Sequence, residues 1–167
     1  MKENASLIEI KSLSVDFKLH AQGIIRAVDG ISFVVPNGSC VALVGESGSG
    51  KSVTAQAILG ILPNVATVAS GEILFRDPLA GSEVMDLAKL DPRSKSYRNI
   101  RGGRISMIFQ EPMTSLSPLH TVGDQVSEAV RLHRDCSMSE SLELSAEMLS
   151  RVGFPDPRGA LNIYPFE

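Results

Sequence analysis

Alternating hydrophobic and polar positions predict β-strands in the first part of the chain. Residues 8–17 alternate loosely between apolar and polar side chains, and residues 27–35 do so again before the turn Pro36-Asn37-Gly38. A period of two places successive side chains on opposite faces of a sheet, and Pro-Asn-Gly is typical of a turn. A further short strand is predicted at residues 71–75.

Two short, largely apolar runs predict strands that are buried on both faces. Residues 40–44 are Cys-Val-Ala-Leu-Val, and residues 104–109 are Arg-Ile-Ser-Met-Ile-Phe. Such runs are typical of parallel sheets, whose two faces are both covered. We therefore expect Cys40 to be a buried small hydrophobe, whereas Cys136 follows Asp135 in a polar turn and has no evident role.

Helical spacing and capping residues predict helices around and after these runs. Residues 53–62 look helical and stop at Pro63, and residues 122–133 carry apolar side chains at positions 122, 126, 129 and 130. Ser137 followed by Glu140 is a capping-box pattern. It opens a helix with an apolar stripe at positions 142, 146, 149 and 152, and Gly153 can end that helix.

The intervening stretches are interpreted as surface. Residues 76–101 are polar and rich in Arg and Lys, which predicts an irregular excursion. The basic run at residues 93–104 is interpreted as a solvated surface, with an electrostatic contact as the alternative. Strands mixed with helices, with a glycine-rich first turn between strand and helix, indicate an α/β nucleotide-binding domain.

Composition narrows the class of protein. A length of 167 residues allows one domain of ordinary size, with 43% hydrophobic and 21% charged residues, close to the globular average. A net charge of −3 without a basic block argues against non-specific binding of nucleic acid. No apolar run approaches the roughly 18 residues of a bilayer span, and residues 1–9 lack the apolar core of a signal peptide. We therefore expect a cytoplasmic protein that reaches a membrane only through partners.

The clearest chemical signal is a glycine-rich run between the predicted strand and the predicted helix. Gly45-Glu46-Ser47-Gly48-Ser49-Gly50-Lys51-Ser52 matches the phosphate-binding pattern G-x-x-x-x-G-K-[ST] at every required position. Glycines let successive backbone N–H groups point at phosphate oxygens. Lys51 would reach the β- and γ-phosphates, and the Ser52 hydroxyl would take one Mg²⁺ position. The helix beginning near Gly50 would present its positive N-terminus to the anion, and a purely structural turn is the alternative.

Gln110 directly follows the apolar run at residues 104–109. A polar side chain at the carboxyl end of a strand lies where open α/β sheets bind ligands. Gln110 is therefore a candidate ligand for Mg²⁺ or for an attacking water. A Gln that only caps the turn is the alternative, and the spacing alone favours that alternative.

Several motifs together resemble the ATPase cassettes of ABC transporters. The loop interior Glu-Ser-Gly-Ser-Gly has the form typical of that family, and Phe109-Gln110-Glu111-Pro112 resembles its Q-loop. Residues 113–119 resemble the oligopeptide, dipeptide and nickel importer branch. Residues 120–134 are most similar to the N-terminal cassettes of microcin C and peptide importers. A kinase or GTPase fits less well, because no guanine-specifying Asn-Lys-x-Asp is present.

The resemblance implies a fold and a division of the chain. The fold is the α/β P-loop NTPase fold of an ABC ATPase cassette, N-terminal part only. It would contain the β-rich ATP-binding subdomain, part of the parallel core sheet and the start of the helical subdomain. We expect residues 1–110 to form the nucleotide-binding core with the Walker A loop. Residues 111–167 would carry the Q-loop and a partial helical subdomain.

The resemblance also implies cofactors and partners. ATP and Mg²⁺ would bind at residues 45–52, including Glu46, whose side chain is assigned no chemistry, with Ser52 and Gln110 as Mg²⁺ ligands. Phe17 lies where the family has an aromatic residue that stacks on adenine, and a plain core residue is the alternative reading. The implied partners are transmembrane permease subunits, a second cassette and, indirectly, a periplasmic solute-binding protein. This places the chain on the cytoplasmic face of the inner membrane, importing peptides or a related small solute.

Several family motifs are not found in these residues. After Tyr164-Pro165-Phe166-Glu167 the family continues into Leu-Ser-Gly-Gly-Gln, and the Walker B Asp, the catalytic Glu and the switch His are also missing from the sequence. We therefore assign no catalytic residue in this chain and expect no significant ATPase activity from this polypeptide alone. We also expect marginal stability, because residues 41–44 and 105–109 would lack neighbouring strands. An inactive remnant of an interrupted importer gene is the alternative interpretation.

Overall fold

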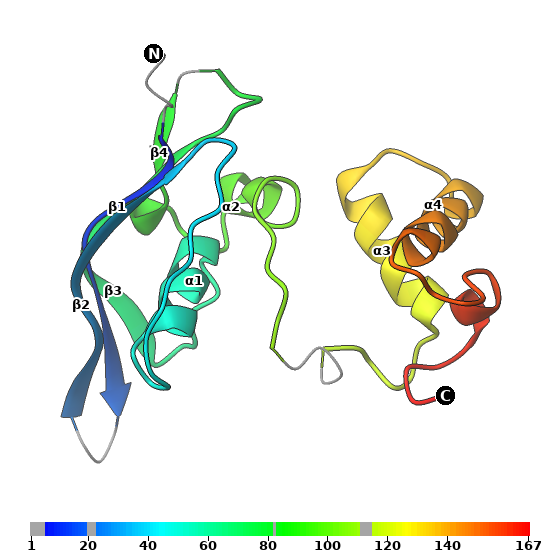
Figure 1. Cartoon of the computed structure of the whole chain (residues 1–167), viewed down its shortest axis with the longest axis horizontal. Helices are drawn as coiled ribbons and strands as arrows, with labels where there is room; N and C mark the ends of the chain where they lie inside the picture. Colours follow the sequence, from blue (N-terminus) through cyan, green and yellow to red (C-terminus); the bar gives the residue numbers. More distant parts are fainter. Residues whose placement is uncertain (1–5, 20–22, 82, 111–114) are drawn as a thin grey trace. The chain divides into compact units, whose positions relative to one another are not determined.

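The computed structural model describes residues 6–19, 23–81, 83–110 and 115–167. The chain divides into two compact units, Met1–Ser106 and Met107–Glu167, and each is described by itself (Figure 1). Residues 111–114, which belong to the stretch that resembles a Q-loop, lie outside the described residues. Among the described residues no helix combines the length and the apolarity that crossing a bilayer requires.

The first unit is built on a four-stranded antiparallel sheet in the order β2-β1-β3-β4. Its strands are β1 (Ser6–Leu19), β2 (Gly23–Pro36), β3 (Ala66–Arg76) and β4 (Val84–Asp86). The strands predicted at residues 8–17, 27–35 and 71–75 are therefore confirmed, and each is longer than its alternating pattern. The pairing of β1 with β2 shifts register several times between Ser6 and Asp16, because extra residues interrupt the ladder there.

Helix α1 (Lys51–Leu59) packs with this sheet to form the core of the unit (Figure 1). The predicted helix is confirmed, but it begins two residues earlier and ends at Gly60 instead of Pro63. Gly60 adopts the left-handed conformation, with φ of 60°, that commonly ends a helix. The fully buried apolar side chains of the sheet are those of Ile10, Leu13, Val15, Ile73 and Phe75.

Residues 76–101 are not the irregular surface excursion that their polarity predicts. They contain β4, a short 3₁₀ helix η1 (Leu87–Lys89) and helix α2 (Lys95–Ile100). The side chains of Leu87, Tyr97 and Ile100 are buried in the core. These apolar residues are few and irregularly spaced, so no periodic pattern in the sequence predicts that the segment packs into the core.

Tyr97 and Arg101 hold the C-terminal end of α1. The Tyr97 hydroxyl donates a hydrogen bond to the Ile58 carbonyl at 3.0 Å, and burial raises the pKa of this phenol to about 12. The Arg101 guanidinium donates to the carbonyls of Leu59 and Gly60, each at 3.1 Å. A positive charge at these carbonyls is favourable, because the last carbonyls of a helix lack helical donors and carry partial negative charge. The basic run at residues 93–104 is therefore not simply a solvated surface.

The two predicted buried strands are wrong. Residues 40–44 and 106–109 are not in strands, and only an isolated bridge joins Arg101 to Ile105. Val44 is 88% exposed and Ile108 is 95% exposed, and Cys40 is exposed rather than buried. A strand of a parallel sheet needs hydrogen-bonded neighbours, and the described residues supply none for these two runs.

The second unit consists of α3 (Val122–His133), α4 (Met138–Arg151) and a 3₁₀ helix η3 (Gly159–Asn162). Both predicted helices are confirmed. The capping box of Ser137 and Glu140 is formed, and Thr121 with Asp124 forms another at the start of α3. These boxes satisfy backbone N–H groups that have no acceptor within the helix.

Packing in the second unit relies on small residues. Gly123, Ser127, Ser141, Ser145 and Ala146 are buried on the two helices. A Cβ on Gly123 would lie 2.5 Å from the Leu161 carbonyl oxygen, so α3 and η3 approach closely at this glycine. The predicted apolar stripe of α4 is wrong at its end, because Val152 is exposed.

Asp77 and Arg104 form an ion pair in the first unit. The Leu79 N–H and the Arg104 guanidinium donate to this buried carboxylate, at 2.9 and 2.7 Å, and together lower its pKa. A carboxylate whose pKa is lower in the folded state than in the unfolded state stabilises the protein at pH values above its unfolded pKa of about 3.9. This stabilisation is lost as the pH falls through the folded-state pKa. We expect Asp77→Asn to lower the melting temperature at pH 7, and the difference from wild type to shrink at pH 3.

Thermal melts followed by circular dichroism at both pH values measure this effect. Glu147→Gln is the matched control, because Glu147 pairs with Arg151 in an exposed i,i+4 pair that contributes little. An Asp77→Asn deficit of equal size at pH 3 and pH 7 would contradict an electrostatic origin.

Candidate phosphate-binding site

The predicted phosphate loop leads directly into α1, as the motif requires. Residues 45–49 are exposed, and Gly50 is the buried N-cap of the helix. Gly48 and Gly50 have φ of 82° and 87°, a region that disfavours residues with a Cβ. The sequence places glycine where the backbone makes these turns, so the loop shape follows from the motif itself.

Gly50 also brings the loop against the sheet. A Cβ at this position would lie 2.6 Å from the Ala27 carbonyl oxygen and 3.0 Å from a Val28 methyl group. Such an approach to backbone is closed to any other residue. Strand β2 therefore contacts the loop at Gly50, where α1 begins.

The Lys51 ammonium lies over the backbone of the loop. Its Nζ donates to the carbonyl oxygens of Gly45 at 2.8 Å and Glu46 at 2.6 Å, and to Ser49 Oγ at 3.2 Å. These contacts hold the two ends of the loop together around one positive charge. The side chain is thus placed beside the glycines, where phosphate oxygens could replace its carbonyl acceptors.

The N-terminus of α1 adds to the positive potential of the loop. Its first turn carries no acidic residue, and Gly50 has no side chain that could cap it. The first N–H groups of a helix have no helical acceptor and carry partial positive charge, which suits an anion. Lys51, the glycine backbone and this helix end form a donor set that fits a phosphate chain.

The other predicted site residues lie in the loop, in the first turn of α1, in β1 and in the second unit. Ser52 is exposed in the first turn of α1, and Glu46, Ser47 and Ser49 are exposed in the loop. Phe17 is half-buried and packs against the core of the first unit. Gln110 is exposed and belongs to the second unit.

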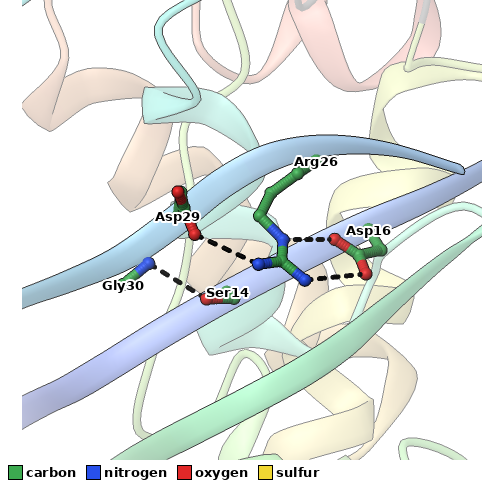
Figure 2. A network of polar contacts seen from close by, with 5 residues as sticks. All are labelled: Ser14, Asp16, Arg26, Asp29 and Gly30. Atoms are coloured by element: carbon green, nitrogen blue, oxygen red, sulfur yellow. Dashed lines mark hydrogen bonds and ion pairs between the residues drawn. The ribbon is translucent and has the colours of Figure 1, made fainter.

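Sequence reasoning missed a polar network between β1 and β2 (Figure 2). The Arg26 guanidinium bonds to the carboxylates of Asp16 and Asp29, and the hydrogen bond to Arg26 lowers the pKa of Asp16. On the same strands, the Gly30 N–H donates to Ser14 Oγ at 3.0 Å. The only signal was a pair of opposite charges, Asp16 in the predicted strand at residues 8–17 and Arg26 directly before the one at residues 27–35. Their pairing depends on a register that the sequence pattern does not give.

Comparison with known proteins decides the family. Residues 28–161 match the model of the family described as ABC transporter. The chain belongs to the ABC transporter family. The matched residues of this ABC transporter chain include the loop at residues 45–52 and Gln110, whereas Phe17 and Arg26 precede them.

Several curated relatives of this ABC transporter chain are named for peptide transport. A putative peptide import ATP-binding protein of Brucella melitensis is 45% identical over 162 residues, covering 96% of this chain and 46% of the relative. The dipeptide transport ATP-binding protein DppD of Bacillus subtilis is 44% identical, with 96% and 45% covered. A peptidoglycan transport ATP-binding protein, YejF of Agrobacterium fabrum, is 44% identical over all of this chain and 29% of its own length. The chain thus spans less than half the length of each of these three relatives.

Solved structures confirm the predicted fold class. The dimeric post-hydrolysis state of an ATP-binding cassette bound to ADP and Pi has a TM-score of 0.74 with this chain. The two chains are 21% identical, and the likeness covers 95% of this chain and 62% of that one. The α/β fold of an ABC cassette is therefore present, although the two expected parallel strands are not formed in the described residues.

Proposed function

We propose that this ABC transporter chain binds ATP at residues 45–52 and provides the ATP-binding part of a peptide importer. The observation that carries the proposal is the position of the Lys51 ammonium, within 2.8 Å of two carbonyls of a glycine loop at the N-terminus of α1. A similar solved cassette holds ADP and Pi, which agrees with a nucleotide ligand.

Different groups of the loop would bind different parts of the triphosphate. Backbone N–H groups of residues 45–50 and of the first turn of α1 would bind phosphate oxygens, and Lys51 would bind the β- and γ-phosphates. Ser52 and Gln110 would hold Mg²⁺, which would neutralise phosphate charge when bound. Phe17 would stack on adenine, which is worth about 1–3 kcal/mol for an aromatic ring against a base.

The wider role is inferred from the names of the relatives. Several are peptide or dipeptide transport proteins, so the imported solute is a peptide or a related small molecule. The partners would be transmembrane permease subunits, a second cassette and, indirectly, a periplasmic solute-binding protein, on the cytoplasmic face of the inner membrane. Residues 1–110 would be the nucleotide-binding core, and residues 111–167 would carry the Q-loop and part of the helical subdomain.

Calorimetric titration of the purified chain with ATP tests the proposal. We expect saturable binding of ATP and ADP, and much weaker binding of adenosine, because the loop contacts phosphates. Omitting Mg²⁺ should weaken the binding of ATP more than the binding of ADP, since a triphosphate carries more negative charge to neutralise. Folded protein, verified by circular dichroism, that binds adenosine as tightly as ATP would contradict a phosphate-binding role for the loop.

A further inference from the structure

Arg26 and Asp16 form a two-pronged ion pair between β1 and β2. Arg26 Nε donates to Asp16 Oδ1 at 2.9 Å, and a terminal nitrogen donates to Oδ2 at 3.4 Å (Figure 2). The Asp16 side chain is only 15% exposed. Two-pronged contact between a guanidinium and a carboxylate fixes orientation as well as distance. Asp29 accepts a longer bond of 3.3 Å from Arg26 and is 79% exposed.

The pair lies next to the place where the register of β1 and β2 shifts. The pairing of β1 with β2 shifts between Leu13 and Val15 and again between Val15 and Asp16. Regular pairing resumes with Asp16 opposite Arg26 and continues to Leu19 opposite Gly23. Within the irregular stretch, between Leu13 and Val15, Ser14 Oγ accepts the Gly30 N–H at 3.0 Å. One side-chain contact thus lies inside the irregular stretch, and the ion pair lies at its end, where regular pairing resumes.

Phe17, which follows Asp16 in β1, depends on the register of this strand. A slip of β1 by one residue would turn its side chains to the opposite face of the sheet. Phe17 would then leave the core against which it packs.

We propose that Arg26 and Asp16 are positioning residues that set the register of β1 and β2 and thereby place Phe17 for nucleotide binding. This inference rests on the proposed function, because it assumes that Phe17 contacts the base. Neither side chain needs to touch the nucleotide. Their effect is on the base-dependent part of the affinity, since the loop is held separately by the contacts of Lys51.

Arg26→Met and Asp16→Asn test the proposal, with Asp29→Asn as the matched control on the same hairpin. We expect the first two variants to weaken ATP binding by about tenfold and binding of inorganic tripolyphosphate by less than threefold, in line with the loss of base stacking. Asp29→Asn should leave both affinities within twofold of wild type. Arg26→Lys should not restore ATP affinity, because an ammonium cannot make the two-pronged contact.

A double-mutant cycle with Phe17→Ala separates positioning from general loosening. If Arg26 acts through Phe17, Arg26→Met should weaken ATP binding little further in the Phe17→Ala background. An NMR contact between residues 17 and 25, which pair in the sheet, should persist in Asp29→Asn and weaken in Arg26→Met and Asp16→Asn. This second readout follows the strand register without any nucleotide.

The outcomes are distinguishable. Equal weakening of ATP and tripolyphosphate, an undiminished effect in the Phe17→Ala background, or an unchanged contact between residues 17 and 25 would overturn the positioning role and leave ATP binding in place. A folded wild-type chain that does not bind ATP would overturn the proposed function, and this inference with it.

Discussion

Lys51→Ala is expected to weaken ATP binding by roughly 10- to 150-fold. A hydrogen bond to a charged group contributes about 1.5–3 kcal/mol, and each 1.4 kcal/mol is a tenfold change in affinity. Lys51 supplies an ammonium that contacts the loop, where it bonds to the Gly45 and Glu46 carbonyls. Under the proposed function, removing it takes away a phosphate partner and a contact that closes the loop, so both effects act in the same direction.

Lys95→Ala is the matched control for Lys51→Ala. Lys95 is also the first residue of a helix, α2, and its side chain is exposed. Both variants lose one positive charge, so a general effect of net charge on an anionic ligand would appear in both. Calorimetric titration with ATP and with adenosine should show a loss that is specific to ATP and to Lys51→Ala. Equal affinities for ATP in the two variants would exclude Lys51 as a phosphate ligand.

Gly71→Ala is expected to destabilise the chain by about 2–5 kcal/mol, through overpacking and through strain at a positive φ. Gly71 lies in β3 with φ of 97°. A Cβ there would lie 2.5 to 2.6 Å from backbone atoms of Lys11, Ser12 and Leu13. These atoms belong to β1, which is paired on both sides, so the strand cannot move away without breaking its ladders. Folded domains have only about 5–15 kcal/mol of stability, so this loss is large.

Gly81→Ala separates the steric cost from the conformational cost. Gly81 has a similar φ of 89°, but a Cβ there would meet no atom of the described residues within 4 Å. This control should therefore lose only the conformational part, about 1 kcal/mol at a positive φ. Urea unfolding followed by circular dichroism compares the midpoints of the two variants with wild type. Equal shifts for Gly71→Ala and Gly81→Ala would show that the contact with β1 is relieved at little cost.

Local sequence signals were sufficient where the structure is local. The capping box of Ser137 and Glu140 and the helical spacing of residues 122–133 predicted α4 and α3, because a helix is stabilised within a few residues of each position. The phosphate loop was predictable for the same reason. Its shape depends on the conformational freedom of Gly48 and Gly50, which is a property of those residues themselves.

Prediction failed where a segment depends on distant partners. Residues 40–44 and 106–109 have the composition of buried strands but are largely exposed, because a strand exists only when another strand pairs with it. The polar stretch around Tyr97 failed in the opposite direction. Its few apolar side chains show no period, yet they are buried because the chain returns to cover the end of α1.

The sequence by itself determined the glycine-rich loop at residues 45–52, the two helices of the second unit and the alternating strands of the first. These features depend on backbone preferences, capping residues and periodicity, which act over a few residues. Only the tertiary structure decided which strands pair, in what register Asp16 meets Arg26, and that Gly50 lies against Ala27. Such contacts join residues that are far apart in the chain, and their geometry is set by the packing of the whole unit rather than by any local pattern.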